Sequence, residues 1–172
     1  MIEELVTLVD ENEKPLGPVQ ISLANSNPQY LHLEVAVIIV DDKRRVLLQK
    51  RSATKKVAPC VWTVAAAGHV TWGDSADATA NKELVEEMGL VVPNLVYMFS
   101  EKVDLKNESH IVRWYIGKYK SGEVVIQPTE VDDFLWITRD NIDEFAKTNN
   151  VSKRTIAISK RYWSGEWDHL LK

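Results

Sequence analysis

The sequence contains a single cysteine, Cys60, among its 172 residues. One cysteine cannot form a disulfide within the chain, and it cannot supply the several thiolates of a cysteine-rich zinc site. Proteins without disulfides are typical of reducing compartments, so we expect a cytoplasmic protein.

Long apolar runs and a basic N-terminus are also lacking. No segment approaches the roughly 20 apolar residues that cross a bilayer. The acidic start MIEELVTLVDENEK has neither the basic region nor the apolar centre of a signal peptide. The formal net charge of −4 is mild and gives no reason to expect a polyanionic partner. We therefore expect neither a membrane nor a nucleic acid as a partner.

The length suits one domain, and strands in the middle of the chain with helices between and after them indicate an α/β or α+β fold. We expect a single domain over residues 1–172, with an N-terminal hairpin extension (1–30) and C-terminal helices (138–172). Runs of β-branched and aliphatic residues predict strands at 5–9, 19–23, 34–40, 45–49, 61–68, 95–99, 110–119, 123–126 and 134–137. Helices are predicted at 74–88, with Asp74 or Ser75 as N-cap, and at 141–147 and 152–164.

Three carboxylates crowd the end of the helix predicted over residues 74–88. Successive helical residues are about 100° apart, so Glu83, Glu86 and Glu87 share one face, where like charges repel. Gly89 is the expected C′ residue, which places these charges at the negative end of the helix dipole. A bound divalent cation would remove both penalties, and Mg²⁺ prefers such hard oxygen ligands. The alternative is an ordinary solvated helix face.

The stretch GHVTWGDSADATANKELVEEMGL, residues 68–90, resembles the Nudix box. The positions that match its spacing are Gly68, Glu83, Leu84, Glu86, Glu87, Gly89 and Leu90. Two positions depart from it, because Asp74 stands for a glutamate and Lys82 for an arginine. The resemblance implies a structural ion pair between Asp74 and Lys82. This pair would be weaker than the family's, because the acid is shorter and lysine lacks the planar fork of arginine.

The resemblance also implies the fold, the cofactor and the chemistry. It implies a Nudix-type α/β/α sandwich with a mixed central sheet, and a MutT-like hydrolase dependent on Mg²⁺ or Mn²⁺. The implied metal ligands are the Gly68 carbonyl and the carboxylates of Glu83, Glu86 and Glu87, with Glu86 and Glu87 also catalytic. Bound Mg²⁺ neutralises a diphosphate and activates water. The general base comes from the box in some members of the family and from a later loop in others. Glu130, in PTEVDDF, is the loop candidate, and an ordinary exposed acid is the alternative.

A second resemblance covers residues 5–136. LHLEVAVII, LLQKRSATKKVAPCVWT and the Gly-His pair at 68–69 resemble the branch of the superfamily that contains the metal-dependent isopentenyl-diphosphate isomerases. In those isomerases the basic loop grips the substrate diphosphate. The resemblance therefore implies substrate binding by Arg51, Lys55 and Lys56, and a solubilising loop is the alternative.

The isomerase machinery is incomplete in this sequence. Ala67 stands where the isomerases have their catalytic cysteine, and a methyl group cannot transfer a proton. Cys60 lies seven residues earlier, where we expect it to pack. His32 and His69 match two ligands of a second metal site in the isomerases, but Asn25 replaces a third and no acid pair matches. Whether His32 and His69 bind a metal stays open, because a histidine beside a strand is more often a structural group.

The sequence therefore predicts a metal-dependent Nudix hydrolase that cleaves a small molecule in which a diphosphate is linked to another moiety, such as a nucleoside. Two alternatives stay open. One is an isopentenyl-diphosphate isomerase-like enzyme, and the other is a non-catalytic Nudix module that binds a nucleotide. The identity of the substrate and the existence of a homodimer also stay open.

Overall fold

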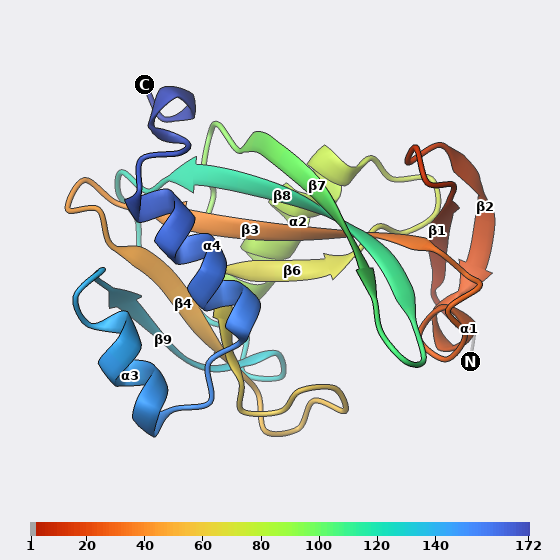
Figure 1. The fold of residues 1–172 in the computed structure, drawn as a ribbon, viewed down its shortest axis with the longest axis horizontal. Coiled ribbons are helices and arrows are strands. Elements are labelled where there is room, and N and C mark those ends of the chain that lie inside the picture. The colour runs from red at the N-terminus through yellow and green to blue at the C-terminus, as the bar shows by residue number, and fades with distance from the viewer. Residues whose placement is uncertain (1–2) are drawn as a thin grey trace.

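A mixed sheet of nine strands organises residues 3–172, the part of the chain that this computed structural model describes (Figure 1). The strands are β1 (Leu5–Val9), β2 (Pro15–Gln20), β3 (His32–Val40), β4 (Val46–Arg51), β5 (Trp62–Val64), β6 (Ala66–His69), β7 (Val96–Asp104), β8 (Ser109–Lys118) and β9 (Val131–Ile137). The helices are α1 (Ile21–Ala24), α2 (Ala76–Met88), α3 (Ile142–Thr148) and α4 (Lys153–Trp163), followed by a 3₁₀ turn at Asp168–Leu170. None of the helices in residues 3–172 has the length and apolar character that crossing a membrane requires.

Strand β3 lies at the centre of the sheet. Along one edge it pairs in parallel with β8 over its whole length, from His32↔His110 to Val40↔Lys118. Along the other edge it pairs antiparallel first with β6 and then with β4. Strands β7 and β9 extend the sheet from β8 and β4, and the β1–β2 hairpin joins it near the start of β3. The sheet is therefore mixed, as predicted.

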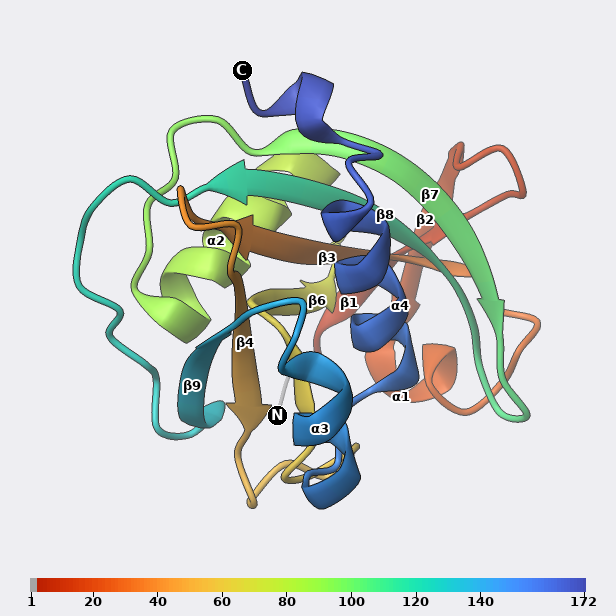
Figure 2. The same cartoon turned by 60° about the vertical axis from the view of Figure 1, so that its left-hand side comes forward.

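Helices α2 and α4 cover opposite faces of the sheet, as both views show (Figures 1 and 2). Side chains alternate between the faces of a strand, so the odd and even residues of β3 enter different cores. The α2 core contains Val35, Val37 and Ile39 with Ala80, Leu84 and Met88. The α4 core contains Ala36, Ile38 and Val40 with Ile158, Tyr162 and Trp163. The predicted α/β/α sandwich is confirmed.

Several predicted elements differ from the structure. The strand predicted over 61–68 is two strands, because β5 pairs with β4 whereas β6 pairs with β3. The strand predicted over 19–23 ends at Gln20, where the pairing with β1 ends, and the chain turns into α1. The hairpins formed by β1 with β2 and by β3 with β4 are confirmed, as are α3 and α4.

The strand predicted over residues 123–126 is wrong, because this segment bonds to the end of α2 instead of to a strand. Val125 donates its main-chain N–H to the Met88 carbonyl at 3.0 Å, and Gln127 donates to the Glu87 carbonyl at 3.1 Å. The last carbonyls of a helix have no partner within the helix. The extended segment therefore satisfies two of them.

Helix α2 begins and ends as its sequence predicts. The Ser75 hydroxyl accepts a hydrogen bond from the Ala78 N–H at 3.1 Å, so Ser75 is the N-cap. Gly89 ends the helix in the left-handed conformation, with φ of 64°. A Cβ at this position would lie 2.9 Å from both Cβ and the carbonyl oxygen of Val125. Gly89 therefore provides both the left-handed turn and the space for the segment that covers the helix end.

We expect Gly89→Ala to lower the free energy of unfolding by more than the roughly 1–2 kcal/mol that a left-handed non-glycine residue costs. Gly89→Asn is the matched variant, because asparagine tolerates the left-handed conformation but carries a Cβ. Both variants should be destabilised in urea titrations. An asparagine variant as stable as the wild type would show that the approach of Val125 is not limiting.

Candidate metal and substrate site

Glu87 is buried on the sheet side of α2, with only 5% of its surface exposed. Its Oε2 accepts a hydrogen bond from Gln49 Nε2 at 2.5 Å, and Gln49 is itself buried on β4. Burial raises the pKa of Glu87 to about 8, against the opposing effect of the Gln49 hydrogen bond, and the nearby charge of Glu83 raises it further. A carboxylate in this position is destabilised in its charged form unless a cation lies beside it.

Glu83 lies one turn earlier, against the backbone of Gly68. A Cβ at position 68 would lie 2.5 Å from the Glu83 carboxyl carbon and 2.6 Å from its Oε1. Burial raises the pKa of Glu83 to about 7, and the charge of Glu86 adds to this effect. Glu86 itself is exposed. The structure therefore brings together Gly68 and the three glutamates that the sequence singled out.

This donor set fits a hard divalent cation. A buried, a half-buried and an exposed carboxyl group (Glu87, Glu83 and Glu86) lie on one helix face beside a glycine whose missing side chain leaves room for Glu83. The pKa values of Glu87 and Glu83 are raised although Gln49 and Arg51 act to lower that of Glu87 and Lys82 acts to lower that of Glu83, so the protein compensates the charged forms only in part. Oxygen-rich sites of this kind are the ones that Mg²⁺ and Mn²⁺ occupy.

The loop that carries Glu130 is tied to the basic loop that follows β4. Glu130 accepts a hydrogen bond at its main-chain carbonyl from the Ser52 N–H at 2.8 Å, and its carboxylate forms an ion pair with Lys55. Its charge is close enough to raise the pKa values of Glu83 and Glu87. The candidate base therefore lies at the edge of the acidic helix face.

The other two basic candidates differ in their surroundings. Arg51, at the end of β4, donates to the Val57 carbonyl at 3.1 Å, and its charge lowers the pKa of Glu87. Lys56 is exposed. Arg51 thus lies near the glutamates, whereas Lys56 extends into solvent.

The predicted ion pair between Asp74 and Lys82 is absent from residues 3–172. Both side chains are exposed, and an exposed pair gains little free energy from its charges. Lys82 lies near Glu83 instead, where its charge lowers the pKa of that carboxyl group. The expectation for Cys60 is also wrong, since its side chain is exposed in the basic loop.

A second polar cluster lies at the start of β3, and the sequence identified only part of it. His32 and His69 do come together, with ring centroids 5.3 Å apart. Glu34 and His110 complete the group. Burial acts to raise the pKa of Glu34, but the adjacent histidines hold it at about 2. Glu34 was missed because only the pairing of β3 with β6 and β8 shows that it faces three histidines.

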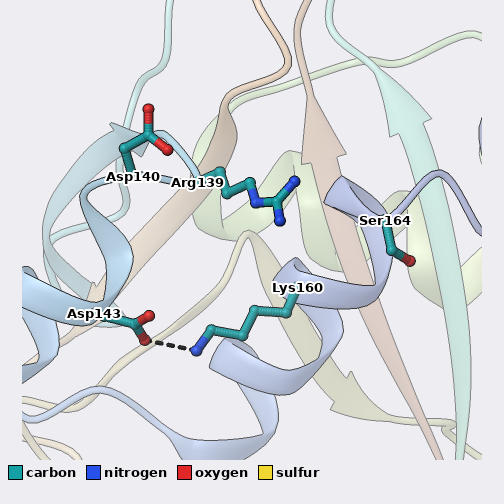
Figure 3. A pocket seen from close by; sticks show the side chains of 5 residues that line it. All are labelled: Arg139, Asp140, Asp143, Lys160 and Ser164. Carbon is teal, nitrogen blue, oxygen red and sulfur yellow. Dashed lines mark hydrogen bonds and ion pairs between the residues drawn. The ribbon is translucent and has the colours of Figure 1, made fainter.

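Two cavities lie outside the glutamate face. One, of about 240 Å³, lies between the sheet and the start of α4 and is lined in part by Glu34, Ala67, Trp114 and Arg154. The other, of about 450 Å³, lies at α3 and α4 and is lined by Arg139, Asp140, Asp143, Lys160 and Ser164 (Figure 3). In the second cavity Lys160 is already paired with Asp143 at 2.7 Å. None of the helix glutamates lines either cavity.

A curled mixed sheet between helices, with an acid-rich helix packed on a glycine, defines the Nudix class of fold. Residues 30–157 match the NUDIX domain, and the chain belongs to this family. Proteins of the family typically use divalent metals.

The relatives include both isomerases and hydrolases, which confirms the predicted resemblance. The chain is 31% identical over 140 residues to isopentenyl-diphosphate Delta-isomerase 2 of Photorhabdus laumondii, a match that covers 79% of this chain and 78% of that protein. It is 28% identical to an uncharacterised Nudix hydrolase of Listeria monocytogenes, over 79% and 80% of the two chains. The family match and the hydrolase relatives support a hydrolase.

Solved structures share the fold. DR0079 from Deinococcus radiodurans has a TM-score of 0.73 at 15% identity, over 92% of this chain and 98% of that chain. The NUDIX domain of Shewanella oneidensis NrtR, complexed with ADP ribose, has a TM-score of 0.63 at 14% identity, over 85% and 92%. At these identities the likeness shows the fold alone.

We expect Gly68→Ala to lower the free energy of unfolding, because the new Cβ must displace the Glu83 carboxyl group. The loss should shrink when Glu83 is also replaced by alanine, with a coupling of at least about 0.5 kcal/mol between the two changes. The control cycle pairs Gly68→Ala with Glu86→Ala, and these two changes should be additive. Additivity in both cycles would show that Glu83 does not limit what position 68 accepts.

Proposed function

We propose that the protein is a Mg²⁺- or Mn²⁺-dependent Nudix hydrolase that cleaves a diphosphate linked to another moiety. The observation that carries the proposal is the buried carboxyl group of Glu87 next to the half-buried one of Glu83 on the same helix face. Burial raises the pKa of Glu87 to about 8 and that of Glu83 to about 7. Burying acids on one helix face costs free energy, which a bound cation would return. A helix with only a structural role would be more stable with apolar residues at these positions.

The Gly68 carbonyl and the carboxylates of Glu83, Glu86 and Glu87 would hold the metal. When bound, the ion neutralises diphosphate charge and makes a coordinated water more acidic. The chain itself orients these groups. The Gln49 amide donates to Glu87, which fixes the rotation of that carboxyl group, and the bare Cα of Gly68 leaves room for Glu83. Neighbours that orient metal ligands in this way tune affinity and activity.

Glu130 is the proposed general base, and its ion pair with Lys55 gives it a substrate-dependent role. In the structure the ammonium group of Lys55 is paired with a carboxylate oxygen of Glu130. A substrate phosphate would compete with Glu130 for the ammonium group, which would leave the carboxylate free to accept a proton from water. Arg51, near Glu87, and the exposed Lys56 would supply further positive charge to the diphosphate.

A nucleoside-linked diphosphate is the proposed substrate class, since the Shewanella domain was solved with ADP ribose and another structural neighbour is a Caenorhabditis elegans Ap4A hydrolase. The proposed working unit is a single Nudix domain over residues 1–172. In this unit the hairpin within 1–30 and the helices within 138–172 are extensions of the metal-binding fold.

The test is release of phosphorylated product from a panel of nucleoside and other diphosphates, with and without Mg²⁺. Glu87→Gln should reduce turnover by about 100-fold or more, because the lost charge weakens the electrostatic stabilisation of the transition state. Glu144→Gln is the matched control, since Glu144 is an exposed acid on α3, and it should leave turnover unchanged.

Thermal melting separates catalysis from simple binding. Millimolar Mg²⁺ should raise the melting temperature of the wild type and have a smaller effect on Glu87→Gln. A melting shift without product from any diphosphate would identify a binding module. Full activity of Glu87→Gln would contradict the proposed site.

We expect no isomerisation of isopentenyl diphosphate, although several relatives are isomerases. Allylic isomerisation needs a proton donor and a proton acceptor on opposite faces of the substrate. Ala67 lines the cavity beside α4 with a methyl group at the position of the isomerases' cysteine. Deuterium exchange from solvent into isopentenyl and dimethylallyl diphosphate is the sensitive measurement. Exchange above a no-enzyme control would indicate an isopentenyl-diphosphate isomerase-like enzyme instead.

A further inference from the structure

The metal loop, residues 70–75 between β6 and α2, lacks the ion pair that the resemblance to the Nudix box implies. Asp74 and Lys82 are both exposed, and neither forms a salt bridge in the part of the chain that the structure describes. This loop joins Gly68, whose carbonyl is a proposed ligand, to the helix that carries the glutamates. Movement of the loop would therefore change how Gly68 lies relative to Glu83.

Strand β1 holds the first half of the metal loop. Thr7 donates its main-chain N–H to the Val70 carbonyl at 2.8 Å, and Trp72 donates its own to the Leu5 carbonyl at 2.8 Å. These two bonds form an antiparallel bridge between β1 and the loop. The hairpin extension at the N-terminus is therefore fastened to the segment that leads into α2.

Two threonine hydroxyl groups add to this junction. Thr7 Oγ1 donates to the Thr71 carbonyl at 3.3 Å, and Thr71 Oγ1 donates to Glu4 Oε1 at 3.1 Å. Thr7 is buried, and a buried hydroxyl group without a partner would cost free energy. The side chains therefore reinforce the contact that the main chain makes.

Tyr115 holds the other end of the metal loop, through the first turn of α2. Its hydroxyl group donates to Asp77 Oδ1 at 2.6 Å, a length typical of a hydroxyl group bound to a carboxylate. Tyr115 is buried in the α2 core and lies on β8 opposite Val37 of β3. The hydrogen bond therefore connects the start of the glutamate helix to the centre of the sheet.

We infer that these contacts replace the missing ion pair and make Thr7, Thr71 and Tyr115 positioning residues of the proposed metal site, an assignment that rests on the proposed function. The bonds from β1 fix the chain that leads away from Gly68. The bond from Tyr115 fixes the start of the helix that carries the glutamates. Together they set the position of the Gly68 carbonyl relative to the carboxylates before a cation binds.

Ligands held in place in this way should bind a cation more tightly. A loosely held loop must be ordered when the ion binds, and ordering costs conformational entropy. The apparent affinity falls in proportion to the fraction of molecules whose site is already formed. One hydrogen bond changes such an equilibrium by a factor of about five.

The experiment measures Mn²⁺ binding to the full chain by electron paramagnetic resonance of the free ion, which needs no substrate and no turnover. Tyr115→Phe keeps the ring and removes only the hydroxyl group, and Thr71→Val keeps the branched side chain. Each should weaken Mn²⁺ binding by about fivefold. The matched control is Tyr162→Phe, because Tyr162 is equally buried but lies in the α4 core, and it should leave Mn²⁺ affinity unchanged.

A rescue variant tests whether the contacts replace the ion pair. Asp74→Glu combined with Lys82→Arg restores the residues of the Nudix box at both positions. Added to Tyr115→Phe, these two changes should recover most of the lost Mn²⁺ affinity. Circular dichroism shows whether each variant is folded. A purely structural role for Tyr115 would lower the melting temperature of Tyr115→Phe without changing the Mn²⁺ affinity of the folded chain, and this result would overturn the inference.

Glu87→Gln separates the failure of this inference from the failure of the proposed function. If Glu87→Gln abolishes Mn²⁺ binding but Tyr115→Phe and Thr71→Val bind as tightly as the wild type, the metal site stands and the positioning role is wrong. The positioning role is also wrong if Tyr115→Phe stays weak after the rescue changes. Mn²⁺ binding that Glu87→Gln leaves intact would contradict the proposed site itself, and the inference with it.

Discussion

Strand β3 is hydrogen-bonded along both edges, and the alternation of its side chains sets the position of nearly every feature described above. Its odd residues pack against α2 and hold the acidic helix on the sheet. Its even residues begin with His32 and Glu34 and continue into the core beneath α4. A shift of one residue in its pairing with β8 would exchange the two faces. The acidic face of α2 and the polar cluster around Glu34 therefore depend on the same register.

Helix α2 combines features that oppose one another. Its caps, Ser75 and Gly89, favour the helix, and its apolar residues pack against β3. Its glutamates destabilise the helix, because Glu87 is buried and the Glu83 carboxyl group lies close to Gly68. Well-packed apolar residues at these positions would make a more stable helix. The structure thus retains an electrostatic cost at the point where a cation would act, a pattern expected of functional sites.

Much of the fold and of the glutamate site could be predicted from the sequence, because both depend on local patterns. The spacing from Gly68 to Leu90 indicates a loop, a helix with its caps and a face of acids, and all of these lie within one short stretch. The segment at 123–126 looked like a strand because valine and isoleucine favour extended backbone. Its partner is the end of a helix, which no local pattern indicates.

The features that sequence reasoning missed depend on contacts between distant segments. Glu34 reads as a polar residue at the start of an apolar strand until the pairing with β6 and β8 surrounds it with histidines. The split of the strand at 61–68 follows from a change of partner between β4 and β3. The predicted ion pair between Asp74 and Lys82 is wrong for another reason. Both side chains are exposed, and an exposed pair gains too little free energy from contact to hold them together.

The bonds that fasten residues 125–127 to the end of α2 also bear on how this protein can change over evolution. Glu130 is held from two directions, through those bonds and through the Ser52 N–H. The stretch from Lys120 to Glu123 just before it is exposed. Exposed connections of this kind accept insertions at small cost. The chain could therefore lengthen at 120–123 to acquire new contacts with larger substrates, while the carboxylate of Glu130 stays in register with the acidic helix.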